Sequence, residues 1–157
     1  KISEELKKYG VLGRFSIDFV TVKQKNEWVH YAIEINLRKG GTTHPYHMLQ
    51  FLTNGKYDAV NGIYNTANGQ PRYYLCTDNL QSEYYKGLTP YDLIDIMTLN
   101  DLLYNGSTQE GVMFHMIGAL SQYGKLGVVC IGTTPQRAAE YYNKTVPVLN
   151  RDNHNNK

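Results

Sequence analysis

Two carboxylates and an amide, Asp18, Glu34 and Asn36, are the side chains of this sequence best suited to bind a hard divalent cation. Asp18 lies in a stretch of alternating apolar and polar residues, 12–22, and the other two lie in a second such stretch, 28–37. The alternation predicts two strands, and the polar segment between them predicts a hairpin that turns near Asn26. Asp18 and Glu34 then lie nearly opposite each other. Directly opposed like charges destabilise a sheet, and Mg²⁺ or Mn²⁺ would relieve that repulsion.

The period of two places Glu34, Asn36 and Arg38 on one face of the second strand, together with His30 and Ala32. A polar, solvent-exposed face is also what an ordinary half-buried hairpin carries. Alternation alone therefore leaves two interpretations open, a metal site and a solvated surface.

A glycine turn follows the second strand and strengthens the metal interpretation. Arg38 and Lys39 precede Gly40-Gly41, and Pro45 predicts a helix over residues 45–53. Glycines let backbone N–H groups approach an oxyanion, and a helix start offers unpaired donors. A metal site beside an anion site is the arrangement that phosphoryl transfer to a carboxylate requires.

The pattern of Asp18 followed by Glu34-Ile35-Asn36-Leu37-Arg38 resembles the metal-binding signature of the ATP-grasp superfamily. Residues 34–45, 114–120, 124–127 and 131–135 are similar to ligases of the pheganomycin-synthesis type, so the resemblance spans nearly the whole chain. It implies ADP-forming carboxylate–amine (peptide) ligation through an acyl-phosphate, with ATP as co-substrate and Mg²⁺ or Mn²⁺ as cofactor.

Each motif position takes a role from this resemblance. It implies that Asp18, Glu34 and Asn36 are metal ligands, that Arg38 is catalytic, that Lys39 contacts the nucleotide, and that the substrate site is lined by Gly40, Gly41, Thr42, Thr43 and His44. One position departs from the pattern. Ser16 stands where some of these ligases carry an arginine, so Arg38 or Arg14 would supply that charge.

The resemblance also implies that part of the enzyme lies elsewhere. The nucleotide lobe of an ATP-grasp ligase precedes this segment, and the sequence begins at Lys1 within a predicted helix. We therefore expect a C-terminal fragment that is inactive alone. Its expected partners are an N-terminal ATP-binding lobe in cis and small-molecule or peptide carboxylate and amine substrates.

The predicted fold is α+β, an antiparallel sheet with packed helices. Residues 1–56 are expected to close the ATP-grasp catalytic domain, 57–150 to form a family-specific α+β domain, and 151–157 to be a disordered tail. Within this frame we expect a long loop or a subdomain boundary over 56–72 and a helix from Thr89-Pro90 to near Gly106. We also expect strand candidates at 112–120 (a helix being the alternative) and 126–131, and a last helix from Thr134-Pro135 that Pro147 ends or kinks.

Charge and cysteine content bear on nucleic-acid binding, membrane binding and the cellular compartment. A net charge of +2 gives no electrostatic reason to expect binding to nucleic acid or to a membrane. Cys76 and Cys130 lack metal-ligand spacing and are expected to be reduced thiols of a cytoplasmic protein. The alternative function is a non-catalytic interaction or dimerisation module, and a homodimer is compatible with either interpretation.

Overall fold

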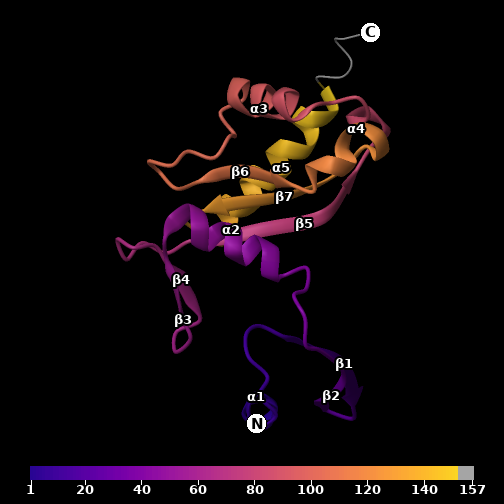
Figure 1. Ribbon diagram of the computed structural model, residues 1–157, viewed down its shortest axis with the longest axis vertical. Helices are drawn as coiled ribbons and strands as arrows, with labels where there is room; N and C mark the ends of the chain where they lie inside the picture. Colours follow the sequence, from indigo (N-terminus) through magenta and orange to yellow (C-terminus); the bar gives the residue numbers. More distant parts are fainter. Residues whose placement is uncertain (152–157) are drawn as a thin grey trace. The chain divides into compact units, whose positions relative to one another are not determined.

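The computed structural model describes residues 1–151, and its mixed α+β architecture confirms the predicted fold class. Three small antiparallel sheets are packed with helices (Figure 1). The elements are α1 (Ile2–Lys8), β1 (Ser16–Gln24), β2 (Glu27–Asn36), α2 (Thr43–Thr53), β3 (Lys56–Asp58), β4 (Ile63–Asn65), β5 (Tyr73–Gln81), the 3-10 turn η1 (Glu83–Tyr85), α3 (Pro90–Leu99), β6 (Gly111–His115), the 3-10 turn η2 (Ile117–Ala119), α4 (Leu120–Tyr123), β7 (Lys125–Gly132) and α5 (Pro135–Arg151).

The chain divides into two compact units, Lys1–Tyr46 and His47–Lys157, which are described separately. The first unit, called the hairpin unit below, contains α1, the β1–β2 hairpin and the first turn of α2. The second, called the sheet unit, contains the remaining elements. The predicted disordered tail at 151–157 falls outside the described residues except for Arg151, whose backbone belongs to α5.

The hairpin pairs the residues that we predicted, but the residues of β2 that precede Ile33 lie on the opposite face from the one predicted. Asp18 pairs with Glu34, and the left-handed Lys25 makes the turn. Between Asp18 and Phe19 the register shifts, because β2 carries one extra residue, Ile33. Opposed residues share a face, so Tyr31 lies on the carboxylate face, whereas we predicted His30 and Ala32 there. That part of the prediction is wrong, since a bulge resets the alternation.

The sheet unit is built around β7, the central strand of the order β5-β7-β6. Alternate residues of β7, Leu126, Val128 and Cys130, enter the main hydrophobic core, and all three are fully buried. Helix α5 packs against β7 and β5, and its Leu149 is likewise fully buried. This sheet and helix form the rigid base on which the connecting loops rest.

Helix α3 begins as predicted and ends earlier than predicted. Thr89 and Asp92 form a reciprocal capping box, with Pro90 in the first turn. The helix ends at Leu99, not near Gly106, because Asn100 turns its side chain back to donate to Ile96 O at 2.8 Å and Asp101 adopts a left-handed backbone. Residues 100–110 therefore form a loop.

Three further expectations change. The segment 56–72 contains the β3–β4 hairpin rather than a structureless loop. Strand β6 stops at His115, and 117–123 turn helical. Helix α5 runs through Pro147, so the proline does not end it. The buried Leu149 anchors the last turn in the core and offsets the lost backbone hydrogen bond.

Candidate functional site

The predicted ligand residues meet at the end of the β1–β2 hairpin that leads into α2. Asp18 and Glu34 are direct cross-strand partners, and Ser16 is the partner of Asn36. Asn36 donates from Nδ2 to Asp18 Oδ2 at 3.4 Å. Asp18 and Glu34 are exposed, and Asn36 is half-buried. The structure thus brings all three side chains to one face, as the sequence predicted.

The glycine turn is closed by Thr43. Its N–H donates to Gly40 O at 3.0 Å, and its Oγ1 accepts from the Gly40 N–H at 3.1 Å. Thr43 is only 6% exposed, so its side chain holds the turn from within. A Cβ added at Gly40 would reach Ser16 Oγ at 4.0 Å, which places the turn next to the start of β1. Turn and carboxylates therefore share one corner of the hairpin unit.

The basic residues at this corner differ in how they are held. Arg14 stacks its guanidinium 3.8 Å from the centroid of the Tyr46 ring, a cation–π contact that fixes its charge. Arg38 is exposed, and its one described contact is a long hydrogen bond to the neighbouring Lys39 O, at 3.4 Å. Arg38 can therefore reorient toward an anion, whereas Arg14 must first break its contact with the Tyr46 ring. His44 and Lys39 are both exposed.

The donor set of this corner is oxygen only. Two carboxylates and an amide are hard ligands, which suit Mg²⁺ or Mn²⁺ and do not suit zinc. Over the described residues, no cluster of three or more His, Cys, Asp or Glu side chains is arranged to hold a metal ion. The corner contributes two carboxylates, so any cation bound there needs further oxygen ligands from substrate or water.

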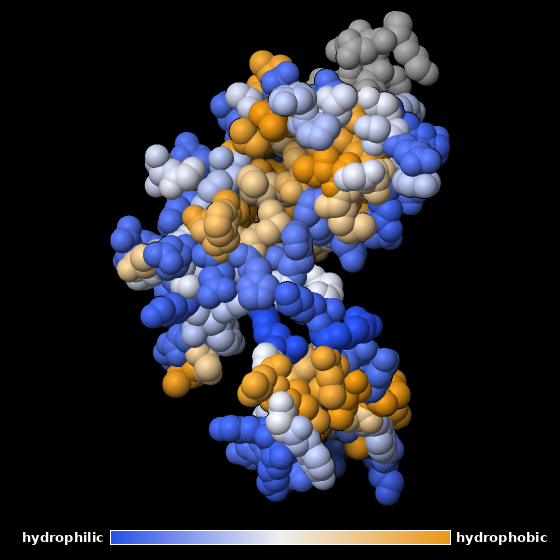
Figure 2. All heavy atoms as spheres, in the orientation of Figure 1, coloured by the Kyte–Doolittle hydropathy of each residue, from blue (hydrophilic) through white to orange (hydrophobic). Residues whose placement is uncertain are grey.

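Apolar side chains along both strands of the hairpin remain exposed. Figure 2 shows apolar surface gathered on the hairpin unit. Both strands contribute, with exposed fractions of 40–63% for Phe19, Val20, Val22, Trp28, Tyr31, Ile33 and Ile35. A two-stranded hairpin with apolar residues exposed on both faces buries little of its own surface.

Comparison with known proteins finds a family match in the second part of the chain. Residues 92–145, from the first turn of α3 to the middle of α5, match the family model of the PGM1 C-terminal domain. The Asp18–Glu34 hairpin lies outside the matched residues, in the hairpin unit.

A longer match covers nearly the whole chain. The chain is similar to the L-propargylglycine–L-glutamate ligase of Streptantibioticus cattleyicolor, with 31% identity over 149 residues, which is 95% of this chain and 30% of that ligase. No solved structure matches. The chain is therefore related to the C-terminal portion of ATP-grasp peptide ligases, and the resemblance seen in the sequence is confirmed.

A second candidate region was not predicted from the sequence. The loop 100–110, within the matched residues 92–145, lines a pocket of about 550 Å³ with Tyr141 of α5. Its polar residues follow no motif spacing, and we predicted part of the loop to be helix. The local signals were Asn100-Asp101 and Asn105-Gly106, which are typical of chain turns.

None of the helices within residues 1–151 has the length and apolarity that crossing a bilayer requires.

Proposed function

We propose that this chain forms the C-terminal part of an ATP-dependent, ADP-forming ligase that joins a carboxylate to an amine through an acyl-phosphate. The observation that carries the proposal is the pairing of Asp18 with Glu34, beside Asn36 and directly before a glycine turn. The relation to an amino-acid ligase along 95% of the chain supports the same class of reaction.

We assign the oxygen-bearing side chains of the corner to metal binding. Asp18, Glu34 and Asn36 would hold Mg²⁺ or Mn²⁺ through their oxygen atoms, and the cation would supply positive charge that stabilises the transferring group. Relief of the Asp18–Glu34 repulsion is the physical reason for binding there. Asn36 takes part after its amide turns its oxygen outward, which breaks only the 3.4 Å bond to Asp18.

The basic residues and the turn act on the anions. Arg38 stabilises the phosphoryl group or the acyl-phosphate with its planar fork, and the exposed Lys39 contacts the nucleotide. The backbone at Gly40 and Gly41, with Thr42 and His44 beside it, receives the carboxylate substrate. Thr43 keeps this turn in shape through its two hydrogen bonds to Gly40.

The rest of the active site comes from another part of the ligase. The chain spans about 30% of the length of its curated relative. The exposed apolar side chains of the hairpin fit a surface that packs against further protein, and we assign that place to the ATP-binding lobe. The chain alone is then inactive, and its dependence on ATP fits a cytoplasmic protein.

The test is an isosteric substitution in the ligase that contains this chain. Glu34→Gln removes one negative charge and keeps the strand, so Mg²⁺-dependent ADP formation should fall about 100-fold or more. Glu27→Gln is the matched control, since Glu27 lies at the other end of the same strand, opposite Gln24. Equal ADP formation in the Glu34→Gln variant and the unchanged protein would refute the metal-binding role.

Exposed apolar side chains of the sheet unit, such as Tyr91, Ile94 and Leu99, favour a second candidate, a non-catalytic module that associates through apolar surface. That module would be a tight homodimer of this chain, held by residues 57–150 in our prediction. Light scattering coupled to gel filtration separates the two proposals. A monomer at micromolar concentration contradicts the dimerisation module, whereas a dimer that is lost when 57–150 are deleted supports it.

A further inference from the structure

The pocket lined by the loop 100–110 has the volume of a small-molecule site. That volume, about 550 Å³, lies within the ~300–1,000 Å³ typical of ligand pockets. All of its lining residues lie between 98 and 141, within the residues 92–145 that match the family model. They belong to the sheet unit, and none of them comes from the hairpin unit.

The charge of the pocket selects its ligand. Asp101 and Glu110 are the formally charged side chains among those described along its wall, and both are carboxylates. The remaining polar lining consists of neutral groups such as Thr98 and Asn105. The lining has two acids and no base, and the arginines beside it, Arg72 and Arg137, are bonded to other groups, so the wall favours a cation over an anion.

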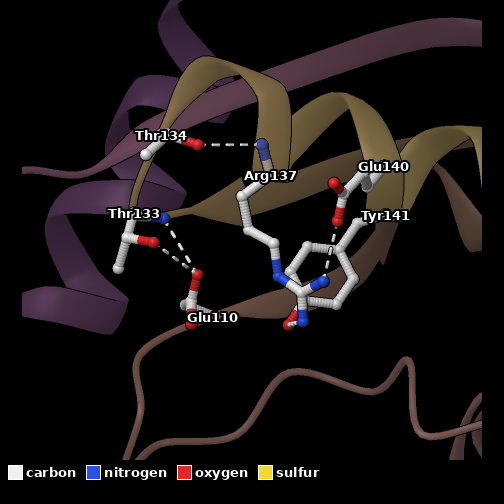
Figure 3. Close-up of polar contacts among 6 residues, drawn as sticks. All are labelled: Glu110, Thr133, Thr134, Arg137, Glu140 and Tyr141. Atoms are coloured by element: carbon white, nitrogen blue, oxygen red, sulfur yellow. Dashed lines mark hydrogen bonds and ion pairs between the residues drawn. The ribbon is translucent and has the colours of Figure 1, made fainter.

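Glu110 is positioned for this role by Thr133, in the turn between β7 and α5. Its Oε1 accepts from the Thr133 N–H at 2.9 Å and from Thr133 Oγ1 at 3.1 Å, as Figure 3 shows. Both bonds fall on one oxygen of a half-buried carboxylate, so its orientation is fixed while Oε2 has no partner among the described contacts. An ionised carboxylate has about four acceptor positions, which leaves room for a ligand N–H group.

The nearby Arg137 does not neutralise Glu110. Its Nη1 pairs with Glu140 Oε2 at 2.9 Å, its Nη2 donates to the Tyr141 hydroxyl at 3.0 Å, and its guanidinium lies 4.3 Å from the centre of the Tyr141 ring (Figure 3). Glu140 is the main cause of the raised pKa of Arg137, and Glu110 is the weakest of the groups that raise it. The arginine charge is therefore shared with Glu140, and Glu110 remains a net acceptor for the pocket.

Two tyrosines and Leu103 form the apolar part of the wall. Tyr141 is only 8% exposed. Tyr104 is half-buried, and its hydroxyl donates to Leu52 O at 3.0 Å. Ring carbons beside carboxylates are the surroundings that an ammonium group on an apolar body prefers.

The loop is also held in place before any ligand arrives. Arg72 donates from Nε to Gln109 O at 3.0 Å and from Nη2 to Thr108 O at 2.8 Å. Gly111 adopts a φ of +124°, and a Cβ there would lie 2.6 Å from the Tyr104 backbone. A wall that needs no reordering loses less entropy on binding.

We propose that this pocket binds a small molecule with a protonated amine on an apolar body, the ammonium group contacting Glu110 and Asp101. Naming this molecule as the amine substrate of the ligase rests on the proposed function. Amine binding itself does not, because it follows from the charge and lining of the pocket.

The test is a binding titration of the ¹⁵N-labelled chain, without ATP or Mg²⁺, followed by NMR. Phenylalaninamide is the cationic probe, N-acetylphenylalaninamide the neutral one and N-acetylphenylalanine the anionic one. We expect saturable shifts at residues 98–110 and Tyr141 with phenylalaninamide, and at least about tenfold weaker binding of the two acetylated probes.

Variants assign the effect to the acids. Glu110→Gln keeps an oxygen for Thr133 and should weaken phenylalaninamide binding about tenfold. Asp101→Asn should act in the same direction without disturbing the fold, since asparagine tolerates the left-handed backbone of this exposed residue (φ 54°). Glu83→Gln is the control, an exposed acid of the sheet unit that pairs with Lys86 and should leave binding unchanged.

Three results would overturn the proposal: no saturable shift at this loop at millimolar phenylalaninamide, equal binding of the acetylated probes, or unchanged binding in both the Glu110→Gln and Asp101→Asn variants. Its failure is separable from that of the proposed function. If the Glu34→Gln ligase loses ADP formation and the pocket binds no amine, the proposed function stands and the pocket proposal fails. If ADP formation is unchanged and the pocket binds the amine, the pocket proposal stands and the metal-binding role fails.

Discussion

Replacing Arg72 by methionine should destabilise the sheet unit by about 3 kcal/mol. Arg72 is 7% exposed, and its guanidinium donates to three backbone carbonyls, those of Pro71, Thr108 and Gln109, at 2.8–3.0 Å. Two of these bonds join segments more than thirty residues apart in sequence. No ion pair to Arg72 occurs among the described residues, so the carbonyl dipoles are what offset the burial of its charge.

The magnitude follows from those bonds. A hydrogen bond to a charged group contributes about 1.5–3 kcal/mol, and the two long-range bonds together give about 3–6 kcal/mol. Methionine keeps most of the aliphatic packing. Thr108 is exposed, so water can replace the arginine at its carbonyl oxygen. The expected loss of unfolding free energy is therefore at the bottom of that range. In urea, with a slope of about 1.5 kcal/mol per molar, the unfolding midpoint should fall by about 2 M.

Urea unfolding followed by far-UV circular dichroism measures the free energy, and amide exchange of 104–112 reports on the loop. Arg38→Met is the matched control, because Arg38 is exposed and makes one long contact at 3.4 Å, so its free energy of unfolding should stay within about 0.5 kcal/mol. A loss below about 1 kcal/mol in the Arg72→Met variant would mean that water replaces the guanidinium, and that the loop owes its shape to other contacts.

Two further predictions concern the sheet unit. Gly111→Ala should destabilise it by more than about 2 kcal/mol in the same urea assay, because the new Cβ meets the Leu103 and Tyr104 backbone, whereas Gly106→Ala, with nothing within 4 Å of its Cβ, should cost less than about 1 kcal/mol. Burial raises the pKa of the Cys130 thiol to about 12 from 9.0, so at pH 8 its alkylation by iodoacetamide should be about 1,000-fold slower in the native chain than in urea, as measured by mass spectrometry. Since the folded pKa is the higher one, the associated stability is complete below pH 9 and is lost as the pH rises toward 12. Rapid native labelling of Cys130 would show that the core opens locally.

The order of the elements followed from local patterns. Alternation in 12–22 and 28–37 with a polar turn sufficed to place Asp18 opposite Glu34, because a hairpin with a short turn has a fixed register. The start of α3 could also be predicted from local sequence. Thr89, Pro90 and Asp92 form the first turn and its capping box without distant partners.

Only the tertiary structure decided the rest. The bulge at Ile33 moved Tyr31 to the carboxylate face, and nothing in the alternation of β2 marks that extra residue. The pocket depends on two long-range contacts. Arg72 bonds to loop residues 36 and 37 positions further along the sequence, and Thr133 bonds to Glu110, 23 positions before it. A local pattern records the period of a helix or strand, whereas contacts across such separations are set by how the elements pack. The sequence therefore determined which side chains could form the Asp18–Glu34 corner, and packing alone created the acidic pocket.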